Sequence, residues 1–161
     1  MTANGVRVIV EKRKPRGVPM SFGETTPPVV RHLLLCQHIA YDLDNTAAPY
    51  SLRGLVTALV PESGDRYPLL LPELWVFFQA SGDSGDYQIW IDLVPVDEDG
   101  EAIGEATTYG PCILIMHEEV YIESRGWKLL NLPFPAPGLY EVRLWCGSDA
   151  IAREQLSLVE A

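Results

Sequence analysis

The stretch that decides the fold is "PAPGLYEVRLWCG", residues 135–147. Pro137 and Gly138 predict a turn, because proline fixes φ and glycine tolerates positive φ. From residue 139 onward the side chains alternate in character, and only a β-strand sorts side chains with a period of two. The face that we expect to line the core holds Tyr140, Val142, Leu144 and Cys146. The opposite face holds Glu141, Arg143 and Trp145, of which Glu141 and Arg143 are expected to form a surface ion pair.

Similar segments recur along the chain and are separated by glycine, proline and aspartate. They cover residues 31–41, 51–60, 74–80, 87–96, 102–109, 112–122, 127–132, 139–146 and 155–159. This spacing predicts an all-β, mostly antiparallel sandwich of seven to nine strands over residues 29–161. Residues 1–28 are expected to form an irregular, basic, Pro- and Gly-rich arm, in which residues 6–10 could add an edge strand.

The turn followed by Leu139 and Tyr140 resembles the tyrosine corner of immunoglobulin-like sandwiches. This resemblance implies that the Tyr140 hydroxyl bonds to backbone upstream and that Val142 stands where antibody domains place a cysteine. No cysteine stands at residue 142, so the disulfide-bonded antibody subclass is excluded. Across residues 31–159, "CQHIAYDLDN", "LRGLVTALV", "DLVPVDEDGEAIG" and "PFPAPGLYEVRL" also resemble an uncharacterised bacterial domain family of unknown function. That resemblance implies a fold and supplies no catalytic residue or cofactor.

Charge separates the two ends of the chain. Residues 1–17 contain five of the 12 Lys and Arg side chains and one of the 22 acidic side chains, which leaves a balance of −14 beyond them. An acidic body repels phosphates, so we expect no nucleic-acid binding through it. The basic arm either contacts an anionic partner or is simply solvated.

The cysteines and the apolar segments indicate a compartment. Three distant cysteines without a C-x-x-C pair predict reduced thiols rather than a disulfide framework. The N-terminus places its apolar run before its charges, unlike a secretory signal, and no apolar run is long enough to span a membrane. We therefore expect a cytoplasmic protein that does not enter a membrane.

Three patterns resemble sites of chemistry without completing one. Gly82 to Gly85 resembles a serine-protease nucleophile loop, but the family's histidine motif is missing. The acidic "VDEDGEAIGE" is out of register for a calcium-binding EF-hand loop, and Asp99 with Gly100 predicts a hairpin turn of the primed type instead. Cys36 with His38, and Cys112 with His117, are weak metal-ligand candidates. We expect no catalytic residue, no bound metal and no cofactor.

Tryptophans are the remaining candidates for a binding site. Trp90 and Trp145 fall opposite the apolar faces of their strands, and Trp75 is a third candidate. Outward tryptophans indicate a partner surface or a sugar-stacking surface, unless other chain segments cover them. The sequence therefore predicts a non-catalytic interaction or assembly module that binds a protein partner or itself. A small-ligand or carbohydrate-binding domain is the alternative, and a hydrolase or metal-dependent enzyme comes third.

Overall fold

The computed structural model describes residues 26–62, 65–118 and 121–160, which fold as an immunoglobulin-like β-sandwich. The strands are β1 (Val29–Tyr41), β2 (Tyr50–Leu55), β3 (Ala58–Leu59), β4 (Leu69–Ser81), β5 (Gly85–Val96), β6 (Thr107–Met116), β7 (Glu123–Phe134), β8 (Gly138–Cys146) and β9 (Asp149–Leu158). Residues 1–25 of the predicted arm, with the expected strand at residues 6–10, lie outside the described residues. The part of the chain that the structure describes contains no helix of the length and apolarity needed to cross a membrane.

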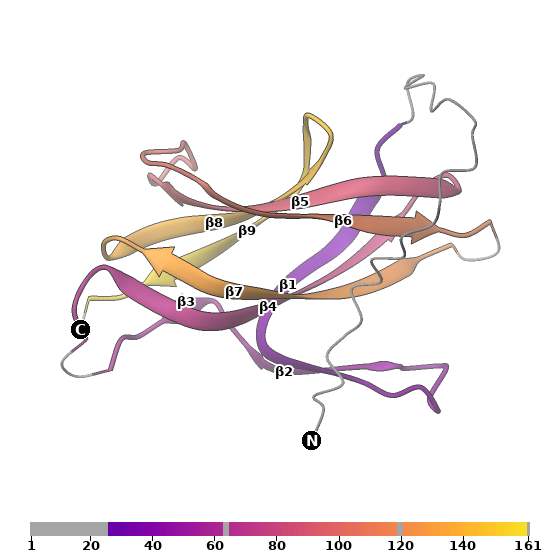
Figure 1. The fold of residues 1–161 in the computed structure, drawn as a ribbon, viewed down its shortest axis with the longest axis horizontal. Helices are drawn as coiled ribbons and strands as arrows, with labels where there is room; N and C mark the ends of the chain where they lie inside the picture. The colour runs from indigo at the N-terminus through magenta and orange to yellow at the C-terminus, as the bar shows by residue number, and fades with distance from the viewer. Residues whose placement is uncertain (1–25, 63–64, 119–120, 161) are drawn as a thin grey trace.

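Two sheets form the layers of the sandwich (Figure 1). One has the strand order β2-β1-β4-β7 and the other has the order β3-β9-β8-β5-β6. All neighbouring strands are antiparallel except β3 and β9, which pair in parallel. The apolar faces of the two sheets meet in one core, whose fully buried side chains include Phe78, Ile91, Leu132 and Leu144.

The predicted tyrosine corner is present. The Tyr140 hydroxyl donates a 2.6 Å hydrogen bond to the Ala136 carbonyl and accepts a 3.3 Å bond from the Ala136 N–H. Its buried ring packs edge-on against Phe134, with ring centroids 4.9 Å apart. Cys146 packs against the core from the same strand face, as the alternation predicts.

A second apolar layer lies on the outer face of the four-stranded sheet. Beyond Cys36, strand β1 leaves β4 and pairs only with β2, and this β1–β2 hairpin lies below β4 and β7 in Figure 1. Tyr50 of the hairpin packs on Phe77 of β4 and donates a 2.8 Å hydrogen bond to the carbonyl of Ser124 in β7. The layer encloses Cys36, Ile39, Trp75 and Phe77.

Several strands differ from their expected bounds: β4 begins at Leu69 rather than at residue 74, β7 begins at Glu123 rather than at residue 127, and the expected segment 51–60 is divided into β2 and β3. Residues 102–109 and 112–122 were expected to form separate segments, but one strand, β6 (Thr107–Met116), joins the end of the first segment to the start of the second. Its register with β5 shifts between Ile89 and Ile91, where Gly110 adopts a φ of 113°. Strand β9 begins at Asp149 rather than near residue 155. Its first half contains good helix formers, but pairing with β8 overrides that preference, as sheet contacts commonly do.

Candidate functional site

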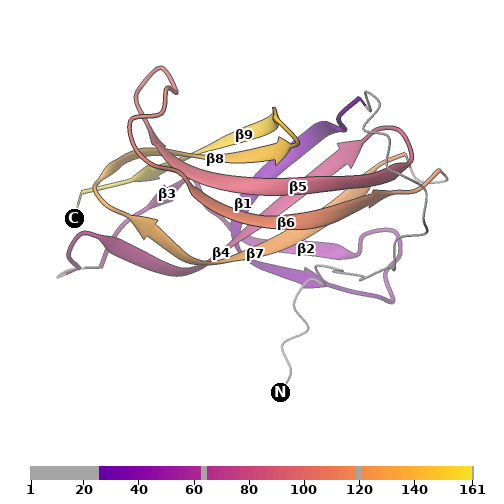
Figure 2. The ribbon, with the colours of Figure 1, turned by 45° about the horizontal axis from the view of Figure 1, so that its top comes forward.

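Trp90 and Trp145 meet on the outer face of the five-stranded sheet. They are direct partners in the antiparallel register of β5 and β8, and both are half-buried. Side chains directly opposite each other in such a pair have Cβ atoms about 4.5–5.5 Å apart, so the two indoles are neighbours. Figure 2 shows β5 and β6 at the front of this sheet, with β8 and β9 behind them.

Aliphatic side chains extend this surface across β6. Leu114 and Met116 point into the core, so the half-buried Ile113 and Ile115 lie on the outer face. They pair with Gln88 and Asp86 of β5, which share the face of Trp90. We call Trp90, Trp145, Ile113 and Ile115 the tryptophan surface.

The exposed part of the Trp145 ring is hydrocarbon. Its Nε1 atom is buried and has no hydrogen-bond partner within the described residues. A ring that exposes only carbon favours apolar packing over hydrogen-bonded recognition at that point.

Polar side chains surround the tryptophan surface. Asp92 lies two residues along β5 from Trp90 and accepts a 2.7 Å hydrogen bond from the Thr108 hydroxyl. Arg153 on β9 is exposed and pairs in register with Arg143. An apolar centre within a polar rim is the usual anatomy of a protein interface.

The Glu141–Arg143 ion pair is buried, which corrects the expectation of a surface pair. The Arg143 Nε atom lies 2.7 Å from Glu141 Oε2, and the two side chains are only 14% and 6% exposed, respectively. The cause is the β5–β6 connection, which folds over this part of the sheet and places the Gly100 carbonyl 2.9 Å from Arg143 Nη2.

Trp75 does not contribute to an exposed surface. It is 3% exposed inside the second apolar layer, with His38 packed edge-on at 5.7 Å and Lys128 Nζ 5.5 Å from its ring centroid. Like Trp145, it has a buried indole N–H without a partner among the described residues. The hairpin that covers it comes from a distant part of the sequence, so alternation within β4 could not reveal its burial.

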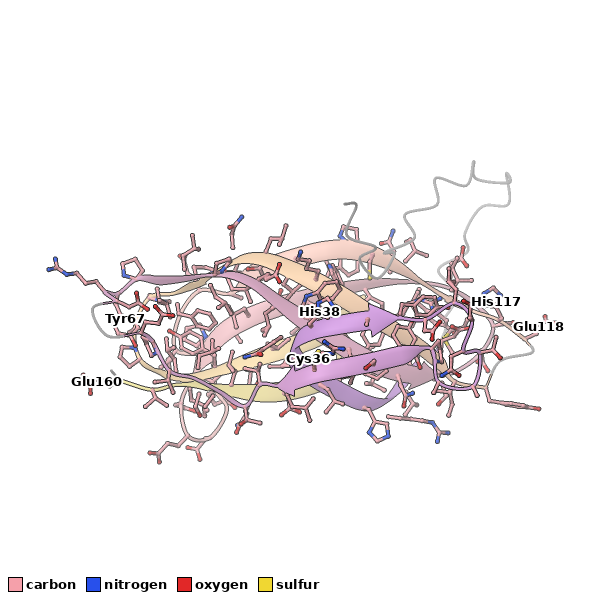
Figure 3. The ribbon with its side chains drawn as sticks, turned by 90° about the horizontal axis from the view of Figure 1, so that it is seen from below. Cys36, His38, Tyr67, His117, Glu118 and Glu160 are labelled. Carbon is pink, nitrogen blue, oxygen red and sulfur yellow. The ribbon has the colours of Figure 1, made fainter. Side chains whose placement is uncertain are left out.

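The two weak metal-ligand pairs lie far apart in the fold. Figure 3 shows Cys36 and His38 on the β1–β2 hairpin, with His117 and Glu118 at one end of the sandwich. Burial raises the pKa of Cys36 to about 11 and that of Cys112 to about 12, which disfavours the thiolate that a metal needs. Within residues 26–62, 65–118 and 121–160, no three His, Cys, Asp or Glu side chains are grouped to hold a metal ion.

A polar depression of about 430 Å³ lies at the end of the sandwich where β4 turns into β5. Its lining includes Arg31, Asp83, Ser84, His117 and Glu118. The fold thus brings the protease-like turn near a histidine. Among the described residues, however, no hydrogen bond links His117 to a serine or a carboxylate, and Arg31 Nε contacts Ser81 Oγ at 3.3 Å. The depression lacks the base–nucleophile contact that acyl transfer requires.

Comparisons with known proteins support the fold and give no family. No protein-family model matches the chain, and no curated protein matches its sequence. Among solved structures, one similar chain is the Pseudomonas fluorescens alkylpurine DNA glycosylase AlkC bound to DNA containing an abasic site analog, with a TM-score of 0.50 and 9% identity. That match covers 86% of this chain but only 32% of the glycosylase. An immunoglobulin-like protein from Pseudomonas aeruginosa matches with a TM-score of 0.43 and 10% identity over 85% of this chain and 100% of that one. At 9% identity the match to the glycosylase concerns the fold alone.

Proposed function

We propose that this protein is a non-catalytic interaction module that binds another protein through the tryptophan surface. The observation that carries the proposal is the direct pairing of Trp90 with Trp145 on an outer sheet face. Adjacent half-buried tryptophans beside Ile113 and Ile115 supply the aromatic and aliphatic centre that dominates binding energy at protein interfaces.

Charge favours a different protein over a second copy. The chain carries a net charge of −10, and residues 18–161 carry −14. Two such bodies repel each other, because like charges on facing surfaces oppose association. A partner with a basic contact surface would instead be attracted to this molecule.

Site-specific cross-linking tests the proposal. A photoreactive amino acid at Gln88, which is exposed beside Trp90, is expected to cross-link a protein partner in cells of the producing organism. The matched control carries the photoreactive group at Leu130, which is 53% exposed on the four-stranded sheet. Equal cross-linking at both positions would contradict the proposed surface.

Binding of the purified partner supplies the decisive measurement. Trp90→Ala and Trp145→Ala are each expected to weaken binding by about 30-fold, the loss typical of an aromatic hot spot. Gln88→Lys alters the same surface without touching the core and should also weaken binding. It tests the surface even if a tryptophan variant proves unstable. Unchanged affinity in all three variants would overturn the proposal.

A carbohydrate ligand is the second candidate function. Two opposed indoles on one sheet face, with Gln88 and Asp92 beside them, also suit the stacking of sugar rings. A panel of oligosaccharides titrated against tryptophan fluorescence separates the two functions. Saturable quenching that Trp90→Ala abolishes would replace the protein-binding proposal with this one.

A further inference from the structure

The β5–β6 connection begins with a tightly bonded acidic turn. Gly100 N–H donates to the Asp97 carbonyl at 3.0 Å, while Asp97 Oδ1 accepts the N–H groups of Asp99 and Glu101 at 3.0 and 2.9 Å. Asp97 N–H also donates to the Glu101 carbonyl at 2.9 Å. Within this turn, Gly100 is the one residue with a positive φ, of 81°. A primed turn of the expected kind needs two such residues, so the hairpin instead has a three-residue loop that ends in a bulge at Gly100.

Arg143 fixes this turn against the outer face of the five-stranded sheet. Its guanidinium bridges Glu141, at 2.7 Å, and the Gly100 carbonyl, at 2.9 Å. A Cβ atom at Gly100 would lie 3.1 Å from Glu141 Oε1, so glycine also permits the close approach of the turn. Because Arg143 and Trp145 are two residues apart on the same strand face, the turn is held one row of side chains away from the tryptophan surface.

The turn presents negative charge at that edge. Glu98, Asp99 and Glu101 are exposed, and none of the three forms a salt bridge with another described residue. Asp86 and Asp92 add carboxylates along β5 on the same face as Trp90. The tryptophan surface therefore has acidic groups beside it on two sides, and Arg153 is the exposed cation in its rim among the described residues.

We propose that the partner of this surface is a Lys- and Arg-rich polypeptide segment. Apolar side chains of the segment pack on Trp90 and Trp145, and its cations lie against Glu98, Asp99 and Glu101. The inference rests on the proposed function of the tryptophan surface and adds the chemistry of the partner. A turn already held in place by Arg143 loses little conformational entropy on binding, which favours affinity.

Fluorescence anisotropy with a defined peptide tests this inference on the full chain. The probe is a fluorescein-labelled peptide, KRKLVLKRK, and its control replaces every Lys and Arg with Gln. The loop-neutral variant combines Glu98→Gln, Asp99→Asn and Glu101→Gln, which are exposed positions. We expect this variant to bind the basic peptide about tenfold more weakly than the unmodified chain, from three surface charge pairs. The control peptide, in which Gln replaces every Lys and Arg, should bind the loop-neutral variant and the unmodified chain with the same affinity.

The outcomes separate this inference from the proposed function. If the loop-neutral variant and the unmodified chain bind the basic peptide with equal affinity, the inference of a Lys- and Arg-rich partner is wrong. If Trp90→Ala and Trp145→Ala weaken partner binding while the loop-neutral variant does not, the interaction surface stands and only its assigned chemistry fails. If the loop-neutral variant loses the peptide but the tryptophan variants keep it, the proposed function fails.

Discussion

Tyr140, near the start of β8, bonds to the preceding turn through its hydroxyl and packs in the core through its ring. The hydroxyl both donates to and accepts from the backbone of Ala136, while the ring is buried against Phe134. The residue therefore fixes the path of the chain between β7 and β8 as well as filling the sandwich. Burial raises the pKa of its hydroxyl, and the bond to Ala136 partly offsets this effect.

Replacing Tyr140 with phenylalanine should destabilise the fold while leaving its packing intact. Tyr140→Phe leaves the Ala136 N–H and carbonyl without their partner and is expected to lower the free energy of unfolding by about 1–3 kcal/mol. Urea denaturation measures this change. Tyr41→Phe, at a residue that is 47% exposed, is the control and should have little effect. Equal effects of the two changes would contradict the structural role of the corner.

Two thiols, that of the buried Cys36 and that of the half-buried Cys112, should make the free energy of unfolding fall at alkaline pH. The pKa values of Cys36 and Cys112 rise from 9.0 to about 11 and about 12, chiefly because burial penalises the thiolate. The unfolded chain therefore loses these protons at lower pH than the folded chain does. Their contribution to stability is fully present below pH 9 and is lost as the pH rises toward 12.

Urea denaturation across that pH range provides the check. The free energy of unfolding should fall more steeply above pH 9 in the unmodified chain than in a Cys36→Ala, Cys112→Ala variant. If the free energy of unfolding of the variant falls as steeply above pH 9 as that of the unmodified chain, the thiols do not cause the pH dependence.

At the scale of elements, the acidic turn depends on the ion pair beneath it. Arg143→Met leaves the Glu141 carboxylate buried and uncompensated, so the free energy of unfolding should fall by about 3–5 kcal/mol. Adding Glu141→Met should recover much of this loss. Arg153→Met, at an exposed neighbour in register, should change stability by less than about 0.5 kcal/mol. Thermal and urea unfolding of the unmodified chain and these three variants measure the changes. A loss of less than about 1 kcal/mol in Arg143→Met alone would be inconsistent with a buried ion pair.

The β1–β2 hairpin should protect Trp75 from solvent. Tyr50→Ala removes the ring that packs on Phe77 and the hydrogen bond to Ser124, and we expect a loss of about 3 kcal/mol in unfolding free energy. The variant should also show stronger acrylamide quenching of tryptophan fluorescence. Leu43→Ala, at a residue that is 79% exposed near the hairpin tip, should change neither quantity. Unaltered quenching in Tyr50→Ala would show that the hairpin is not what shields Trp75.

Local patterns predicted some of these elements better than others. Strand β8 and its corner could be predicted because a turn and a period-two alternation lie within a dozen residues. Burial of Glu141 and of Trp75 could not, because each is covered by a segment distant in sequence. The sequence placed Trp90 and Trp145 on outward faces, but their adjacency depends on the β5–β8 register, which no local signal encodes.

At the scale of the whole molecule, the excess of negative charge opposes compactness. A net charge of −10 on 161 residues produces self-repulsion in the folded state, and salt screens it. Raising NaCl from about 0.02 M to about 0.5 M should raise the unfolding midpoint by roughly 3 °C, equivalent to about 1 kcal/mol. Differential scanning calorimetry at both salt concentrations tests this, and a fall in the midpoint would mean that attractive charge pairs dominate.

The irregularities of β6 and β7 have a consequence for solubility. Each is an edge strand of its sheet. One row of its backbone N–H and C=O groups therefore has no neighbouring strand in that sheet to pair with. A long, straight edge invites addition of further strands and the growth of aggregates. Gly110 interrupts the register of β6, and β7 contains Asn131, with a φ of 55°, and Pro133, which has no N–H to donate. These irregularities make either edge a poorer template for a further strand, so they oppose fibril-like stacking of copies of this chain.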